Sequence, residues 1–154
     1  MKQTITDFKK EEHSVVFVIW ENPVPKGRPR STLRNNKINV FTDTKTRQYE
    51  FRTKLWLVRK VGFTQFEGAL KVTAHFYIKP PKKYKKEDIE KEKYYPKTRP
   101  DLDNYVKTLL DVCNGIIFKD DAQVVEIETF KKYANEPKTF VKVEVLNGTK
   151  EKTK

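Results

Sequence analysis

Two pairs of aspartates are the residues in this chain best suited to do chemistry. The first pair is Asp101 and Asp103, and the second is Asp120 and Asp121. The rest of the chain is basic, with 33 Lys and Arg against 21 Asp and Glu and a formal net charge of +12. Carboxylates bind Mg²⁺ together with waters and phosphate oxygens, and a basic protein surface favours a phosphate-rich partner. The combination predicts a site that holds a divalent metal ion against a polyanion.

The spacing of the two pairs allows them to meet. Asp101 and Asp103 are two residues apart, so in an extended segment both carboxylates project to one side. The helix predicted next, at 104–114, would be about 16 Å long at 1.5 Å per residue. Residues 115–120 can span about 20 Å in the opposite direction, so the second pair can return beside the first. The N-terminal end of the helix would also favour negative charge.

A structural alternative remains, in which these carboxylates only cap a helix and a turn. Two pairs that flank the same helix favour metal binding. An EF-hand is excluded, because that loop needs Gly at its sixth position and Glu at its twelfth, where this chain has Val106 and Val112. Ligation by Asp alone favours Mg²⁺, with Mn²⁺ as a substitute, over zinc; His13 and His75 stand alone in the sequence.

Basic residues near the acidic pairs are predicted to meet phosphate. Lys107 follows Asp103 by four residues, one helical turn, so it can offset charge on a phosphate group at the same site. The alternative is an exposed lysine paired with Asp111 at i+4. Further DNA contacts are predicted for Lys26, Arg28 and Arg30, where prolines hold the segment open, and for Arg99, which lies just before the first acidic pair. A solvated loop is the alternative for the segment 26–30.

The elements that must position these residues form a single α+β domain, with a mixed sheet of four to five strands and two main helices. The clearest strand is 70–78, where apolar and polar residues alternate. In the first helix Phe51, Leu55 and Val58 fall on one face, which predicts that this face is buried. The predicted strands are 15–20, 38–41, 70–78, 124–132 and 140–146. One predicted helix begins after an N-cap among residues 42–44 and runs to about residue 60, a second spans about 104–114, and a brief helix is predicted near 87–93.

The domain is predicted to span residues 14–147, between a flexible N-terminal extension (1–13) and a charged tail (148–154). Within it, 81–99 is predicted to be an exposed basic loop. Its lysines and tyrosines suit stacking on unpaired bases, and its acidic residues argue against that role. The single cysteine, the lack of a signal-peptide pattern in 1–13 and the short apolar runs predict a cytoplasmic, DNA-associated protein with no membrane contact.

Three segments of the chain, 99–107, 110–115 and 118–124, resemble the RusA-type Holliday junction resolvases of bacteria and their prophages. They carry, in order, Asp-x-Asp-Asn, a lysine one turn on, a short helix that ends near Asn-Gly, and Asp-Asp-x-Gln-Val. The basic segment 25–30 is similar to the N-terminal basic motif of that family. The resemblance implies a RusA-like fold and a homodimeric, Mg²⁺-dependent endonuclease that nicks four-way DNA junctions symmetrically.

The resemblance also implies roles for individual residues. Asp101, Asp103 and Asp121 would be the metal-binding catalytic carboxylates, Asp120 a supporting acid and Lys107 the catalytic lysine. Two alternatives stay open: a nuclease with the same chemistry that acts on flaps, RNA or nicked duplex, and a DNA-binding module without catalytic activity.

Overall fold

Five strands form a mixed sheet in the order β1-β2-β7-β5-β6, and two further strands, β3 and β4, form a separate hairpin. The computed structural model describes residues 8–27, 30–41, 43–91 and 94–146, without the side chains of Arg30 and Phe41. The strands are β1 (Phe8–Lys10), β2 (Ser14–Ile19), β3 (Arg30–Arg34), β4 (Lys37–Phe41), β5 (Leu70–Ile78), β6 (Val124–Tyr133) and β7 (Lys138–Val145), and the helices are α1 (Thr44–Lys60), α2 (Lys86–Glu90) and α3 (Leu102–Cys113). The predicted α+β class is confirmed.

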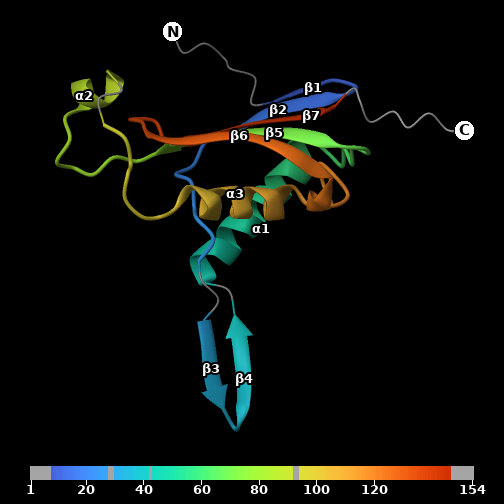
Figure 1. Cartoon of the computed structure of the whole chain (residues 1–154), viewed down its shortest axis with the longest axis horizontal. Coiled ribbons are helices and arrows are strands. Elements are labelled where there is room, and N and C mark those ends of the chain that lie inside the picture. The colour runs from blue at the N-terminus through green and yellow to red at the C-terminus, as the bar shows by residue number, and fades with distance from the viewer. Residues whose placement is uncertain (1–7, 28–29, 42, 92–93, 147–154) are drawn as a thin grey trace, which may run out of the picture.

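The two long helices, α1 and α3, lie against the same face of the sheet (Figure 1). Within the sheet, β5 pairs with β7 antiparallel and with β6 parallel. A parallel pair requires a crossover connection, and here the crossover contains α3. The chain therefore runs from β5 through α3 and returns to the edge of the sheet as β6.

Alternation along the strands builds the core between the sheet and the two long helices. Val72, Ala74 and Phe76 of β5 are buried, as are Val141 and Val143 of β7. They pack in one cluster with residues of α1 and α3. Each fully buried apolar side chain stabilises the fold by about 1.5–3 kcal/mol, so the period-two pattern holds the sheet on α3.

The opposite face of the sheet carries aromatic side chains. His75 stacks on Phe130 of β6, with ring centroids 4.0 Å apart, and on Phe140 of β7 at 5.3 Å. Partial burial lowers the pKa of His75. This histidine therefore lies on the face opposite to the helices.

The predicted bounds of the first helix are confirmed, but its predicted buried face is wrong. Phe51 is 65% exposed and Leu55 is 40% exposed. The buried residues of α1 are Thr46, Tyr49, Thr53 and Leu57, and Val58 is partly buried. The hydroxyl of Thr53 donates to the Tyr49 carbonyl at 2.7 Å, so its polar group is satisfied within the helix. Threonine can therefore lie on the buried face of α1. The spacing of Phe51 and Leu55 consequently predicts the wrong face of this helix as buried.

Strand β1 comes from the segment predicted to be a flexible extension. Phe8 pairs with Phe17 and Lys10 with Val15 in an antiparallel ladder with β2, so the sheet begins earlier in the chain than predicted. The predicted strand at 38–41 is confirmed as part of β4. Its partner β3 lies in a segment for which no strand is predicted. Residues 1–7 of the extension and the tail 148–154 lie outside the described residues.

The predicted loop 81–99 contains the short helix α2, close to the brief helix predicted near 87–93. Ile89 of α2 is buried, and Tyr84 stacks on Tyr94 with ring centroids 4.3 Å apart. The side chain of Asn135 donates to the Lys86 carbonyl at 3.2 Å. Two of the tyrosines proposed for base stacking therefore contact each other, and the described part of this loop is attached to the domain. Residues 92–93 lie outside the described residues.

None of the helices in the described part of the chain combines the length and the apolarity needed to cross a membrane.

Candidate active site

The first aspartate pair lies at the N-terminal end of α3. Asp101 occupies the N-cap position, but its side chain makes no capping hydrogen bond. Asp103 is the second residue of the helix and is exposed. Neither carboxylate has an ion pair or a side-chain hydrogen bond with another described residue. The capping alternative therefore does not account for Asp101, and both carboxylates are open to a ligand.

The second pair lies at a 3₁₀ turn, η1 (Asp121–Gln123), immediately before β6. The carboxylate of Asp120 accepts a hydrogen bond from the Ala122 amide at 3.0 Å, and the Asp120 amide donates to Gln123 Oε1 at 2.9 Å. The Ala122 amide is the main cause that lowers the pKa of Asp120, and the Asp121 side chain adds to it. For Asp120 the capping alternative matches the geometry. Asp121, the next residue, makes no such cap.

Gln123 fastens this turn to the segment that leads into β5. Its side-chain amide donates to the Phe66 carbonyl at 2.8 Å and to the Gly68 carbonyl at 3.1 Å. Both ends of the amide are used, because its oxygen accepts from Asp120. The position of Asp121 is therefore set by a side chain two residues later.

A chain of alternating charges links the helices to this turn. We call Glu50, Lys26, Asp111, Lys107 and Asp121 the ionic chain. Lys26 Nζ lies 2.8 Å from Glu50 Oε1 and 3.1 Å from Asp111 Oδ2. Lys107 Nζ lies 3.1 Å from Asp111 Oδ1 and 4.0 Å from Asp121 Oδ2. Lys107 is therefore held between α3 and the turn that carries the second aspartate pair.

The middle of the ionic chain is shielded from solvent. The side chains of Lys26 and Asp111 are 25% and 23% exposed, whereas that of Lys107 is 55% exposed. Burial alone would raise the pKa of Asp111, but hydrogen bonds from Lys26 and Lys107 outweigh it and hold the pKa below its usual value. Burial alone would lower the pKa of Lys26, but Glu50 and Asp111 together raise it. Lys26 and Asp111 are therefore both charged at neutral pH, and the more exposed ammonium of Lys107 lies between Asp111 and Asp121.

Lys131 of β6 supports the segment that leads into the first pair. Its ammonium donates to the Thr98 carbonyl at 2.9 Å and to the Pro100 carbonyl at 2.8 Å. Arg99 lies between these two carbonyls and is exposed. The approach to Asp101 is therefore held by the sheet, and the predicted DNA contact Arg99 is open to solvent beside it.

The donor chemistry fits a hard divalent cation such as Mg²⁺, because it consists of carboxylates without Cys or His. Among the residues that the structure describes, however, no three His, Cys, Asp or Glu side chains lie close enough together to hold a metal ion. The structure thus brings Asp121 to Lys107, one turn after Asp103, without closing three carboxylates around one point. Asp121 thus approaches Lys107 of α3, whereas the predicted carboxylate cluster of both pairs at the start of the helix is not found among the residues that the structure describes.

The predicted DNA contacts fall into different positions. Lys26 is paired with two carboxylates of this protein. Neither the predicted phosphate contact nor the alternative of a solvated loop includes these ion pairs. Arg28 lies outside the described residues. Arg30 begins β3, and its side chain is not described. Of the four predicted contacts, Arg99 is the one seen exposed beside the aspartates.

The sequence pattern indicates no role for Glu50, Gln123 or Lys131, and Asp111 is considered only as the i+4 partner of an exposed Lys107. Glu50, Lys26 and Asp111 are far apart in the sequence, and no local spacing links them. For Gln123 a signal is present, because Asp followed three residues later by Gln is a capping-box pattern. The structure shows both bonds of that box.

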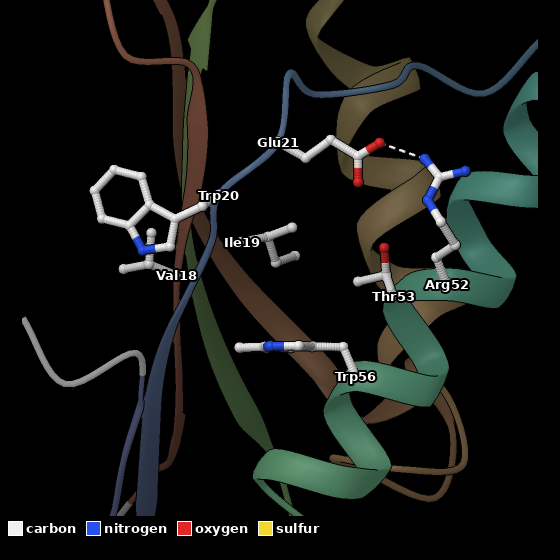
Figure 2. A pocket seen from close by; sticks show the side chains of 7 residues that line it. All are labelled: Val18, Ile19, Trp20, Glu21, Arg52, Thr53 and Trp56. Carbon is white, nitrogen blue, oxygen red and sulfur yellow. Dashed lines mark hydrogen bonds and ion pairs between the residues drawn. The ribbon is translucent and has the colours of Figure 1, made fainter.

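A separate hollow of about 450 Å³ lies between the end of β2 and the middle of α1 (Figure 2). Ile19, Thr53 and Trp56 point into it, and the ion pair of Glu21 with Arg52 closes one side. Its one carboxylate is already paired with an arginine. The hollow therefore lacks the exposed carboxylates found at α3 and is a weaker candidate for a metal site.

Replacing Gln123 by alanine is expected to destabilise the domain and to displace Asp121. Three hydrogen bonds are lost, each worth about 0.5–1.5 kcal/mol, so a loss of about 1.5–4.5 kcal/mol is expected in urea unfolding. The loss of a residue that supports a predicted metal ligand is expected to lower the predicted nuclease activity about 10- to 100-fold. Gln65→Ala is the control, because Gln65 makes one side-chain bond, to the Gly115 carbonyl. Equal activity in the two variants would contradict the positioning role of Gln123.

A basic α+β domain with exposed carboxylates and a lysine beside one helix end is compatible with a nuclease, and the comparison with known families identifies that class. A family model described as Endodeoxyribonuclease RusA matches residues 21–144, and the chain belongs to this family. The family acts on branched DNA junctions, in general with divalent metal ions. The chain is also similar to Uncharacterized protein YqaN of Bacillus subtilis (strain 168), with 34% identity over 139 residues, which is 87% of this chain and 98% of that protein. The resemblance stated from the sequence is confirmed.

Proposed function

We propose that this protein resolves four-way DNA junctions by paired, symmetric nicks and that it depends on Mg²⁺. The observation that carries the proposal is the position of Lys107 Nζ, 3.1 Å from Asp111 and 4.0 Å from Asp121. It lies one turn after Asp103, whose exposed carboxylate has no ion pair with another described residue. Membership in a family of endodeoxyribonucleases supports the reaction type. The substrate is DNA in the bacterial or phage-infected cytoplasm.

Asp101, Asp103 and Asp121 are the residues that would hold the metal ion. When bound, Mg²⁺ supplies an activated water and polarises the scissile phosphate. Asp101 and Asp103 bring negative charge to the N-terminal end of α3, where the helix dipole favours it. Their carboxylates need no rearrangement of described ion pairs before they bind a ligand.

Lys107 offsets the negative charge that builds up on the non-bridging phosphate oxygens. Its ammonium is held from one side by Asp111, so it needs little reorganisation when the phosphate arrives. Asp120 acts as a supporting acid through the turn that it caps. Arg99, exposed next to Asp101, contacts a neighbouring phosphate.

We propose a homodimer as the active form. A four-way junction presents equivalent strands related by twofold symmetry, and a C2 dimer places two identical sites on them. With two active sites bound to the same junction, the dimer can make both nicks without dissociating and binding again.

The test is cleavage of a synthetic four-way junction beside a linear duplex of matched sequence, with Mg²⁺ and with a chelator. We expect paired nicks in the junction and not in the duplex, with Mg²⁺ and not with the chelator. Light scattering at micromolar concentration is expected to show a dimer. Flaps, RNA and nicked duplex are included as further substrates, and their cleavage in preference to the junction would support the alternative of a nuclease with the same chemistry and another substrate. Tight junction binding without any cut in Mg²⁺ or Mn²⁺ would identify a DNA-binding module and contradict the proposal.

A further inference from the structure

The hairpin of β3 and β4 stands apart from the rest of the domain. Figure 1 shows this two-stranded ribbon extending away from the sheet and from both long helices. Every side chain from residue 31 to residue 40 is exposed. Asn35 and Asn36 at its tip have positive φ angles of 51° and 57°, as a tight two-residue turn requires. The ribbon is thus a regular hairpin with a set register and no core of its own.

The register divides the ribbon into two faces. Leu33 lies opposite Ile38, and Ser31 lies opposite Val40, so these four side chains share one face. Leu33, Ile38 and Val40 are 74%, 73% and 67% exposed. A two-stranded ribbon with an uncovered apolar face is at best marginally stable by itself. The apolar face therefore needs a partner.

The other face identifies the kind of partner. Arg34 and Lys37 lie directly opposite each other at the tip, and like charges in that position destabilise a hairpin. The segment 28–41 contains three arginines and one lysine and no acidic residue. A second copy of this chain would bring the same charges and the same repulsion, whereas a polyanion would remove it. Charge complementarity favours nucleic acid.

The root of the ribbon lies at the active site. A Cβ built on Gly27 would be 3.1 Å from Asp43 Cβ, so the chain leaves and re-enters the domain at one place. The preceding residue, Lys26, belongs to the ionic chain, and its amide donates to the Asn104 carbonyl of α3 at 2.9 Å. DNA that is bound along the ribbon would therefore continue toward Lys107.

We propose that the β3–β4 hairpin is a DNA-binding arm that lies in a groove of branched DNA next to the cleaved strand. A two-stranded β-ribbon fits the major groove. In this arrangement Arg34 and Lys37 contact phosphates, and the apolar face packs on bases that are unstacked at the branch, as apolar wedges do. The proposal rests on the proposed function, since it takes branched DNA as the substrate.

Charge reversal at the tip tests the basic face. Arg34→Glu/Lys37→Glu is compared with Lys10→Glu/Lys79→Glu, a control with the same change in net charge at two exposed lysines, one in β1 and one after β5. In chelator, the tip variant is expected to bind a four-way junction at least about tenfold more weakly at about 0.1 M salt, with the slope of log K against log salt reduced by about 2. Equal affinity in the two variants would overturn the proposal.

The apolar face is tested with Leu33→Ser/Ile38→Ser. These side chains are exposed, so the fold is expected to be unchanged. We expect weaker binding to the junction and unchanged binding to a linear duplex, both measured in chelator. An equal loss on both DNAs, or a change from dimer to monomer by light scattering, would overturn the assignment of this face.

These binding measurements separate the arm from the nuclease reaction. If the parent protein binds junctions without cutting them and the tip variant binds more weakly, the proposed function fails and the arm stands. If the parent protein cuts junctions and neither hairpin variant changes binding, the arm fails and the proposed function stands.

Discussion

Replacing Asp103 by asparagine is expected to lower junction cleavage by more than about 100-fold, because the loss of a residue that only supports a metal ligand already costs about 10- to 100-fold. Junction binding is expected to be preserved or tightened, since one negative charge near the phosphates is removed. Single-turnover cleavage and binding in chelator, measured on the same preparation, check both expectations.

The position of Asp103 makes this substitution a clean test of chemistry. It is exposed, it is the second residue of α3, and it has no ion pair with another described residue. Asparagine has the same size, so the expected cost in stability is limited to the interaction with the helix dipole, about 0.3–1 kcal/mol.

Glu87→Gln is the matched control. Glu87 is an exposed acid at the second position of another helix, α2, so its loss changes the charge and the helix end in the same way. We expect cleavage within about twofold of the parent protein. If Asp103→Asn cleaved as well as Glu87→Gln, the first aspartate pair would have no catalytic role.

Replacing Asp111 by asparagine is expected to affect both stability and cleavage. Each carboxylate oxygen of Asp111 accepts from one ammonium, Lys107 at Oδ1 and Lys26 at Oδ2. An asparagine keeps one acceptor and turns an amide N–H toward the other ammonium. We expect a loss of about 1–3 kcal/mol in the free energy of unfolding, and a fall in cleavage of about 10- to 100-fold as Lys107 loses its anchor.

The stability effect of Asp111 is expected to depend on pH. Its pKa in the folded protein lies below the usual value of 3.8. Its contribution is therefore complete above that value and is lost as the pH falls through the lower pKa of the folded state. Urea unfolding at pH 7 should show the full difference between the two proteins, and the difference should shrink below pH 3.8.

Glu50→Gln separates the two effects of Asp111. Glu50 pairs with Lys26 and not with Lys107, so its loss is expected to reduce stability without a matching loss of the single-turnover rate. If both variants lost activity in proportion to stability, Asp111 would have a structural role only.

The parts of the fold that could be predicted from the sequence are those with local rules. Strand β5 has the predicted bounds, Leu70–Ile78, because alternation is a property of neighbouring residues. Helix α1 ends where predicted, but its predicted buried face is wrong, because the buried face carries Tyr49 and Thr53, which an apolar periodicity does not count. Strand β3 follows a proline-rich segment and carries one large apolar residue, Leu33, so its pairing is set by its partner.

The candidate site divides in the same way. The return of Asp121 to the helix follows from the length of α3 and the reach of the next segment, both readable from the sequence. The ionic chain does not, because Lys26, Glu50 and Asp111 meet only after α1 and α3 have packed. The sequence also does not tell that the carboxylate of Asp101 makes no capping hydrogen bond whereas that of Asp120 does. Only the hydrogen-bond geometry distinguishes the two residues.

The position of β6 has a consequence for the durability of the active site. Asp121 lies immediately before β6, and Lys131 within β6 holds the segment before Asp101. This strand is at the edge of the sheet and pairs on one side only, with β5. Edge elements open at a lower free energy than the central strands. Detachment of this one strand would therefore release both acidic segments while the core stays folded. The free energy that holds the candidate site together is then that of local opening of β6, not that of global unfolding.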